Sequence, residues 1–266
     1  MTSVNGHRAD ATTLTGVSET ALLTLRARAN EARRPDAIID DPIAIKLMDS
    51  IDYDFSKFGP ARRQIFALRA LAFDEEARRY LAAYPCATVV ALAEGLQTSF
   101  WRIDEMDSSH EFRWLTVDLP PIIELRRRLL PRSPRISVRA QSALDFSWMD
   151  AVDPAQGVFV TAEGLLMYLQ PDQALGLIEE CARRFPAGQL IFDLPPRWIP
   201  AATRHGFRTS LRYRVPPMPF SLSVAEIADL VNTVPGVRAV HDMPLPRGRR
   251  PFSLLLWTLQ DRKSVV

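Results

Sequence analysis

A strand, a short turn, a helix and a second strand ending in a carboxylate follow one another between residues 87 and 118. This order constrains the fold more than any other feature of the chain. The run Ala87–Leu92 is apolar, Ala93-Glu94-Gly95 forms the turn, and the second strand ends at Asp118. A Rossmann-type sheet places such a carboxylate beside the first turn, where it meets the ribose of a nucleoside cofactor. The segment therefore predicts a doubly wound α/β domain with a nucleoside-cofactor site.

The turn also bears on which cofactor is bound. Ala93 and Gly95 stand where the first two glycines of a G-x-G-x-x-G series would, and Thr98 stands at the third. One glycine is a poor cradle for a pyrophosphate. S-adenosylmethionine carries a ribose but no phosphate, so a single glycine that allows close backbone approach suffices. The spacing favours a methyl donor, although small-residue turns also occur simply to let a helix pack on a sheet.

Length and composition narrow the class of protein. The 266 residues suit one large α/β domain, and 33 Lys plus Arg against 31 Asp plus Glu give no reason to expect nucleic acid or an anionic membrane as partner. Two cysteines and four scattered histidines predict neither a disulfide framework nor a metal site. No signal peptide or stretch of about 20 apolar residues is visible, so we expect a cytoplasmic protein.

The chain is expected to form a single domain over residues 1–266. Three helices precede the first strand, at about 19–30, 42–48 and 62–80, with Ser18 as the expected N-cap of the first. They cannot join a strand–helix alternation, so they are expected to cover the carboxyl edge of the sheet. The expected order is a flexible arm (1–15), a helical cap (16–85), a Rossmann-like core (86–194), a lid rich in Pro, Arg and aromatics (195–221), and a C-terminal helix with hairpin strands (222–266).

Seven strands are expected in one mostly parallel sheet. The last two are joined only by residues 244–251, too short for a parallel crossover, so they are expected to be antiparallel. Ser223 and Glu226 have capping-box spacing and predict that a helix starts at Ser223, between the fifth and sixth strands. The expected strands are 88–92, 113–118, 136–139, 157–162, 189–194, 237–242 and 252–259.

Two further charged residues are candidates for chemistry. Glu163 follows the fourth expected strand and would share a crevice with Asp118, where two acidic groups suit a sulfonium-bearing ligand. The other interpretation is that Glu163 caps the following helix. Arg69, on an otherwise apolar helix, could hold a carboxylate with a bidentate fork, or pair with Asp74 or Glu76 on the surface. The arginines at 126–128 and 247–250 are interpreted as solvated faces.

Taken together, these segments resemble the leucine carboxyl methyltransferase superfamily, in particular a bacterial branch that contains carboxyl O-methyltransferases of polyketide assembly. The resemblance covers nearly the whole chain, and the combination is more specific than any one part. It is carried by Val17–Leu25, Arg33–Ala37, Asp40-Asp41-Pro42, Ile51–Phe55, the Arg69 helix, Glu94–Thr98, Phe100-Trp101-Arg102, Val117–Pro120 and Ala162–Tyr168.

The resemblance implies a class I methyltransferase fold and S-adenosylmethionine as methyl donor. By motif position, Arg69 would hold the methionine carboxylate, Asp118 the ribose hydroxyls, and Glu163 would face the methionine amino group. Gly95 would admit the methionine backbone, and residues 142 and 143 would contact adenine. The full set of implied cofactor contacts is Arg69, Ala93, Gly95, Asp118, Leu119, Ser142, Ala143 and Glu163.

The sequence departs from the family pattern at two places. Glycine is usual where Ala93 stands, and Asp-Leu is frequent where Ser142-Ala143 stands, so the cofactor affinity is the property most affected. One alternative to an enzyme is therefore a methyltransferase-like binding protein without catalysis. A nicotinamide dehydrogenase is a weaker alternative, because the glycine series is missing.

The expected acceptor is a carboxylate, or a hydroxyl, of a small molecule of secondary metabolism such as a polyketide. A carboxylate is already ionised near neutral pH, so correct placement supplies most of the catalysis and no dedicated catalytic residue is expected. A phenol would benefit from a nearby base. Acceptor contacts are assigned to Tyr168, Arg197 and Trp198, and the other lid arginines would suit a carboxylate. Neither the acceptor's identity nor the oligomeric state follows from the sequence.

Overall fold

Five parallel strands form the centre of the fold. The computed structural model describes residues 8–59, 64–107, 109, 111–249 and 263–265. The strands lie in the order β7-β6-β3-β4-β5, so the winding reverses beside β3, and a crevice for a ligand is expected where it does. The bounds are β3 Thr88–Leu92, β4 Arg113–Asp118, β5 Ile136–Ala140, β6 Val158–Ala162 and β7 Gln189–Asp193.

Apolar runs explain why the more central of these segments became strands, whereas β5 at the edge alternates apolar and polar residues and is more exposed. In β3 the residues from Val89 to Leu92 are all at most 2% exposed, and β6 and β7 are nearly as buried. Strands covered on both faces read as continuous apolar runs, and this made them recognisable in the sequence. All five predicted strands are confirmed to within one residue at either end.

The edge beyond β7 differs from the prediction. The sixth strand was expected at 237–242, but β10 spans His241–Met243, and residues 237–240 are not extended in the sheet. The expected seventh strand at 252–259 lies outside the described residues, and β11 spans Lys263–Val265. It pairs antiparallel with both β7 and β10, which extends the sheet to the order β10-β11-β7-β6-β3-β4-β5. Val237 does not join the sheet because its N–H donates back to the Val234 carbonyl at 3.3 Å, within the turn that Gly236 forms at φ +84°.

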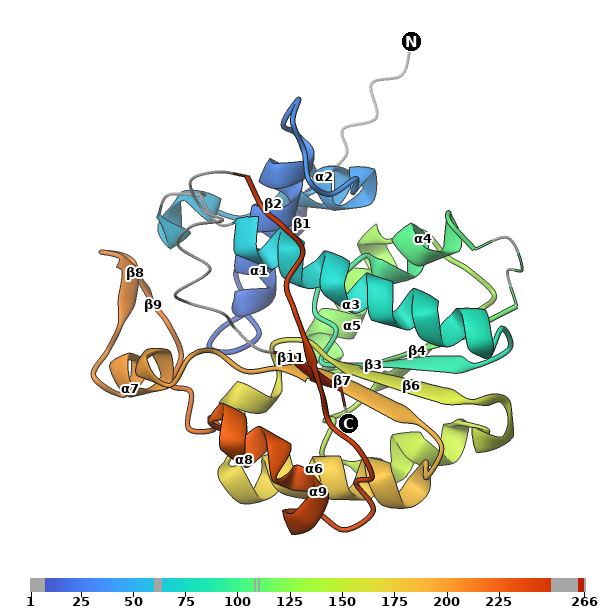
Figure 1. The fold of residues 1–266 in the computed structure, drawn as a ribbon. Coiled ribbons are helices and arrows are strands. Elements are labelled where there is room, and N and C mark those ends of the chain that lie inside the picture. The colour runs from blue at the N-terminus through green and yellow to red at the C-terminus, as the bar shows by residue number, and fades with distance from the viewer. Residues whose placement is uncertain (1–7, 60–63, 108, 110, 250–262, 266) are drawn as a thin grey trace.

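Helices cover both faces of the sheet (Figure 1). On one side lie α3 (Gln64–Ala83), α4 (Ser99–Asp104) and α5 (Pro120–Leu129), and on the other α6 (Pro171–Arg184), α8 (Val224–Ala228) and α9 (Leu230–Thr233). The predicted capping box of α8 is confirmed, since Ser223 Oγ accepts the Glu226 N–H at 3.2 Å while Glu226 accepts the Ser223 N–H at 2.6 Å. Short 3-10 turns complete this part: η2 Phe146–Ala151, η3 Pro154–Gln156 and η4 Leu166–Tyr168.

The segment before α3 is more ordered than expected. Of the predicted flexible arm, residues 1–7 lie outside the described part, but Ala9, Ala11 and Leu14 are at most 4% exposed. Strand β1 (Ala9–Asp10) pairs in parallel with β2 (Ile51–Asp52), which anchors this segment. The arm prediction is therefore wrong for residues 9–14, because the apolar side chains of Ala9, Ala11 and Leu14 are buried, although the segment is too short to show a period.

Two helices and a 3-10 turn follow that segment. Helix α1 spans Thr20–Ala32 and begins after Glu19, so Ser18 is not its N-cap as predicted. Helix α2 (Pro42–Asp49) begins as predicted, with the Asp41 side chain accepting the Ala44 N–H at 2.9 Å. The turn η1 spans Phe55–Phe58.

Residues 195–221 form a separate projection beside the carboxyl edge of the sheet (Figure 1). They contain helix α7 (Trp198–Arg204) and the antiparallel strands β8 (Arg208–Ser210) and β9 (Tyr213–Arg214). Thr209 Oγ1 donates to the Phe58 carbonyl at 3.1 Å, so this hairpin rests on η1. Among the described helices of the chain, none is long and apolar enough to cross a membrane.

Candidate functional site

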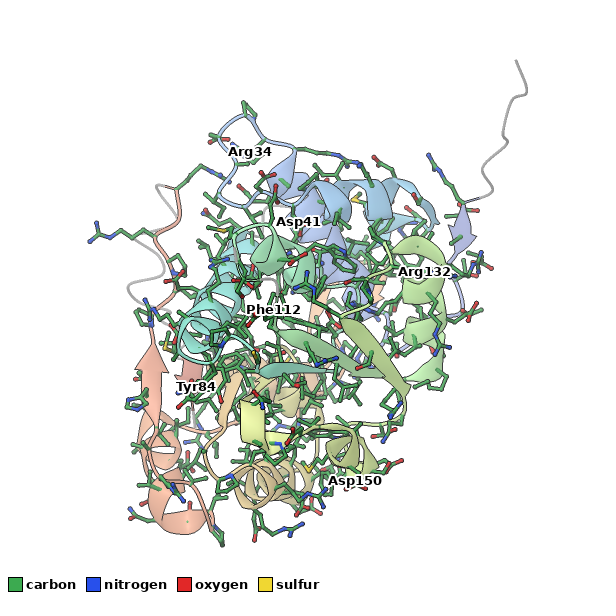
Figure 2. All side chains as sticks on the ribbon, turned by 90° about the vertical axis from the view of Figure 1, so that its right-hand side faces the viewer. Arg34, Asp41, Tyr84, Phe112, Arg132 and Asp150 are labelled. Atoms are coloured by element: carbon green, nitrogen blue, oxygen red, sulfur yellow. The ribbon has the colours of Figure 1, made fainter. Side chains whose placement is uncertain are left out.

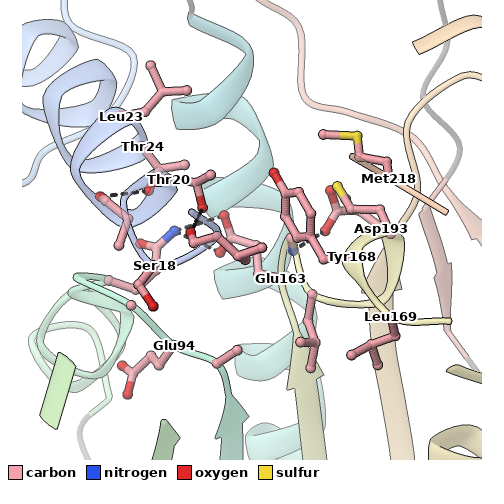
Figure 3. Close-up of a pocket in the computed structure, with 18 of the residues that line it drawn as sticks. Ser18, Thr20, Leu23, Thr24, Glu94, Glu163, Tyr168, Leu169, Asp193 and Met218 are labelled. Atoms are coloured by element: carbon pink, nitrogen blue, oxygen red, sulfur yellow. Dashed lines mark hydrogen bonds between the residues drawn. The ribbon is translucent and has the colours of Figure 1, made fainter. Parts of the chain in front are cut away.

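A cavity of about 610 Å³ opens at the carboxyl edge of the sheet, at the reversal point beside β3. Its walls come from the ends of β3, β4, β6 and β7, from the start of α1, from α3 and from the 195–218 segment. Figure 3 shows Ser18 and Thr20 on one wall and Tyr168 with Asp193 on another. A cavity of this volume is large enough for a nucleoside together with a second small molecule.

Asp118 is the acceptor that organises one side of the cavity. Its Oδ2 accepts the Gly95 N–H at 2.6 Å, and its Oδ1 accepts the Leu119 N–H at 2.7 Å. Each carboxylate oxygen keeps a second lone pair, which suits the paired hydroxyls of a ribose. Burial raises the pKa of Asp118 to about 6, against the two N–H bonds, which act to lower it.

The turn between β3 and α4 depends on left-handed backbone. Gly95 has φ +60°, and a Cβ added there would lie 3.1 Å from the Ala21 Cβ. Ala93 has φ +48° and is the only non-glycine residue with a positive φ in the described part of the chain. Alanine in place of glycine at position 93 therefore does not abolish the left-handed turn. The left-handed conformation of this L-residue costs about 1–2 kcal/mol of folding free energy.

Replacing Gly95 with alanine tests how tightly this turn is specified. The added methyl group meets Ala21 and forces an L-residue into the left-handed region, so we expect a loss of about 1–3 kcal/mol of unfolding free energy and weaker ligand binding. Gly176→Ala is the matched control, since its Cβ meets nothing within 4 Å and alanine favours a helix. Urea titrations of both variants measure the effect, and equal stabilities would contradict it.

Arg69 forms the second polar group of the cavity. Its Nε donates to Glu163 at 2.8 Å and its Nη1 to Asp193 at 3.0 Å, while Gln97 also donates to Glu163 at 2.8 Å. Burial alone would lower the pKa of Arg69, but the charges of Asp193 and Glu163 outweigh burial and raise it. The guanidinium is thus a permanent cation, held in one orientation by two carboxylates.

The alternative that Arg69 pairs with Asp74 or Glu76 on the surface is wrong. Asp74 is buried and accepts from Arg102 Nε at 2.7 Å, and Glu76 accepts from Arg79 at 2.6 Å. Asp74 and Glu76 lie about one and a half to two turns further along α3 and do not line the cavity, whereas Arg69 lines it and pairs with Glu163.

Arg126 also departs from the prediction, since it is buried rather than part of a solvated face. Its Nη1 donates to the carbonyls of Gly95 at 2.9 Å and Gln97 at 3.0 Å, and its Nη2 lies 2.9 Å from a Glu94 oxygen. Helix α5 thereby holds the turn whose residues line the cavity.

Ten of the eleven residues assigned from the sequence line this one cavity. Arg197 does not. It is 61% exposed on the side chain and lies 3.4 Å from Glu226, with which it forms an ion pair. Its assignment as an acceptor contact is therefore wrong, because α7 turns it to the outer face and turns Trp198 inward. The ten that line the cavity are Arg69, Ala93, Gly95, Asp118, Leu119, Ser142, Ala143, Glu163, Tyr168 and Trp198.

The sequence interpretation missed Asp193 and Gln97 as site residues. Asp193 accepts the Gly164 N–H at 2.7 Å as well as Arg69, so it fixes the loop after β6. A signal was present: β7 ends at Asp193 and continues into Leu-Pro, just as β4 ends at Asp118 and continues into Leu-Pro. The wall formed by Ser18 and Thr20 had no such signal, because it depends on how α1 packs on the sheet.

The strand order, the ribose-type carboxylate beside a tight turn and the cavity at the reversal point define a class I methyltransferase fold. The fold is shared with solved proteins from Streptomyces avermitilis (TM-score 0.57, 15% identity, 91% of this chain and 95% of that one) and Thermobifida fusca (TM-score 0.54, 17% identity, 92% of each). Residues 21–182 match the model of the leucine carboxyl methyltransferase family. The chain belongs to this family of methyltransferases.

Relatives with curated names agree with this placement. The chain is 34% identical over 245 residues, 90% of its length and 88% of the other, to the tetracenomycin polyketide synthesis O-methyltransferase TcmP of Streptomyces glaucescens. It is 28% identical over 203 residues, 69% of its length and 67% of the other, to the S-adenosyl-L-methionine-dependent methyltransferase dpfgK of Gibberella zeae.

Proposed function

We propose that the protein is an S-adenosylmethionine-dependent O-methyltransferase that acts on a small apolar molecule of secondary metabolism. The observation that carries this proposal is that one cavity is lined both by buried charged groups, Asp118 and Arg69 with its two carboxylates, and by apolar and aromatic side chains. The charged groups match a nucleoside donor with a methionine moiety, and the apolar lining matches the body of a small organic acceptor.

The residues present fit S-adenosylmethionine. Asp118 has lone pairs for the ribose hydroxyls, Arg69 is a fixed cation for the methionine carboxylate, and Gly95 leaves room that a Cβ would fill. Gln97 adds a buried oxygen, Oε1, that accepts nothing from the described residues and can accept from the methionine amino group. Leu119, Ser142 and Ala143 are then left for the adenine. When bound, S-adenosylmethionine supplies an electrophilic methyl group on a sulfonium.

The chain's own contribution is to bind and to exclude water. We assign residues 16–85 as a cap and 195–221 as a lid, because Thr20 and Ala21 of the first and Trp198, Phe207 and Tyr213 of the second line the same cavity. Closing both around an acceptor would place its oxygen against the donor in a dry site, which is where proximity contributes most. A cytoplasmic location is part of this proposal.

A calorimetric titration with S-adenosylmethionine, S-adenosylhomocysteine and NAD tests the proposal. Saturable binding of the first two and no binding of NAD is the expected result. If none of them bound to folded protein, the alternative of a binding protein without catalysis would be favoured. If only NAD bound, the dehydrogenase alternative would be favoured.

The pKa of Asp118 predicts that donor binding depends on pH. Ribose hydroxyls bind best to the ionised carboxylate, and the pKa of Asp118 in the folded protein is raised to about 6 by burial. Affinity should therefore be nearly constant above pH 7 and fall about tenfold between pH 7 and pH 5 as the carboxyl group protonates. Calorimetry in buffers spanning this range measures it, and an affinity independent of pH would contradict the role of Asp118.

A further inference from the structure

Asp193 contacts both parts of the cavity that are proposed to hold the methionine end of the donor. It ends β7, is buried and lines the cavity. Its Oδ2 accepts from Arg69 Nη1 at 3.0 Å, and its Oδ1 accepts the Gly164 N–H at 2.7 Å. Gly164 directly follows Glu163, whose side chain lies near Asp193 in Figure 3. One side chain on β7 therefore holds Arg69 of α3 and also the loop that carries Glu163.

The two carboxylates that bind Arg69 are held in different ways. Glu163 accepts from Arg69 Nε at 2.8 Å and from Gln97 Nε2 at 2.8 Å, and both of these donors belong to side chains. Asp193 is bonded to a backbone N–H as well, which fixes its position. The donor's amino group is a cation at neutral pH and would compete with Arg69 for Glu163. Asp193 is therefore the partner that can keep Arg69 in place while the donor is bound.

The guanidinium of Arg69 has a third nitrogen that can bind a ligand. The bonds to Glu163 and Asp193 use Nε and Nη1, so Nη2 can donate to a carboxylate without breaking either bond. Gly164 has φ +68°, and a Cβ added there would lie 3.3 Å from Nη2 and 3.4 Å from Nη1. Asp193 thus fixes both the orientation of the guanidinium and the glycine turn that packs against it.

We infer that Asp193 is a positioning residue, which acts through Arg69 and the Glu163–Gly164 turn to shape the site for the methionine end of the donor. This inference rests on the proposed function and adds a residue to it. The methionine end is a zwitterion at pH 7, so a change of charge at position 193 acts on its carboxylate and its ammonium in opposite directions. Loss of the Asp193 charge therefore acts on binding mainly through the position of Arg69.

Replacing Asp193 with asparagine tests the inference with two ligands that differ at the methionine end. S-adenosylhomocysteine has the amino-acid end, whereas 5′-methylthioadenosine keeps the adenosine and the sulfur but ends in a methyl group. The asparagine oxygen still accepts the Gly164 N–H, but its amide nitrogen cannot accept from Arg69. At pH 7 we expect S-adenosylhomocysteine to bind about tenfold more weakly than in the parent, and 5′-methylthioadenosine to stay within about twofold.

Direct calorimetric titration measures the first affinity, and displacement of bound S-adenosylhomocysteine measures the second. Asp118→Asn is the matched control, because it removes a carboxylate from the ribose side of the cavity and should weaken both ligands by similar factors. Equal weakening of both ligands in Asp193→Asn would overturn the inference, as would unchanged or tighter binding of S-adenosylhomocysteine. Failure of the parent to bind S-adenosylhomocysteine would instead overturn the proposed function.

Gly164→Ala disturbs Arg69 from the other side, and it keeps the inference testable if Asp193→Asn does not fold. The added methyl group would lie 3.3 Å from Arg69 Nη2, so the guanidinium must shift, and we expect the same selective loss of S-adenosylhomocysteine binding. Gly236→Ala is the matched control. Gly236 also has a left-handed backbone, at φ +84°, and its Cβ would lie 3.2 Å from Ala182 Cβ, between α9 and β10 and outside the cavity. Parental affinity for S-adenosylhomocysteine in folded Gly164→Ala would overturn the inference.

Discussion

Replacing Asp118 with asparagine is expected to weaken S-adenosylmethionine binding by about 10- to 100-fold. The substitution keeps the shape of the side chain but removes the charge that accepts the ribose hydroxyls, and hydrogen bonds to charged groups contribute about 1.5–3 kcal/mol each. An asparagine oxygen can still accept the Gly95 N–H, so the turn should be retained. Calorimetric titration of the variant measures the change.

A measurement of folding stability distinguishes a specific loss of donor affinity in Asp118→Asn from destabilisation of the whole fold. The folded pKa of Asp118 lies near 6, above the value of 3.8 for an unperturbed aspartate. Ionisation of Asp118 therefore costs stability, a cost fully present above pH 6 and relieved as the pH falls towards 4. The asparagine variant should be about as stable as the parent at pH 7, because removal of the buried charge offsets the loss of the hydrogen bond from the Leu119 N–H to Oδ1. Asp172→Asn, on the exposed start of α6, is the control, and equal donor affinity in both variants would contradict the assignment of Asp118.

Replacing Arg28 with methionine is expected to have the largest effect on stability, about 3–5 kcal/mol. Arg28 is fully buried and donates to Asp41 at 2.6 Å and to the Leu96 carbonyl at 2.6 Å. Asp41 lies among the helices on one side of the sheet (Figure 2) and also accepts from Arg102 at 2.7 Å. Removing one member of such a buried pair leaves an uncompensated charge, which is why the cost is high.

Arg28, Asp41 and Arg102 form a buried charged cluster. The cluster joins α1 to the turn between β3 and α4 through Thr98, whose hydroxyl donates to Asp41 at 2.6 Å. Urea unfolding of Arg28→Met should therefore show both a large loss of stability and weaker donor binding. Arg183→Met removes an arginine that is 62% exposed and pairs with Glu180, and should cost at most about 1 kcal/mol. If the two variants were equally stable, the cluster would not hold α1 on the sheet.

The features that could be predicted are those determined by local sequence, that is, by the residues directly before and after a position in the chain. Buried parallel strands appear in the sequence as continuous apolar runs. Asp118 could be recognised as a candidate ribose ligand because it is the carboxylate that ends the second of these strands, β4. Arg69 and Glu163 were assigned from separate segments, and the structure brings them to 2.8 Å.

The part that could not be predicted depends on packing between distant segments. Arg197 and Trp198 are adjacent in the chain, and only the orientation of α7 places the tryptophan in the cavity and the arginine outside. Arg126 belongs to a run of three arginines that reads as solvated, yet the contact of α5 with the turn buries it. β10 is three residues long, too short to show a period, and its partner β11 lies twenty residues further along the chain.

A crystal structure of the protein with S-adenosylhomocysteine tests the central claim most directly. The account predicts the ribose hydroxyls on Asp118, the homocysteine carboxylate on Arg69 and the adenine beside Ser142 and Ala143, with the apolar end of the cavity left for the acceptor. A nucleoside bound with its ribose away from Asp118, or outside this cavity, would contradict it.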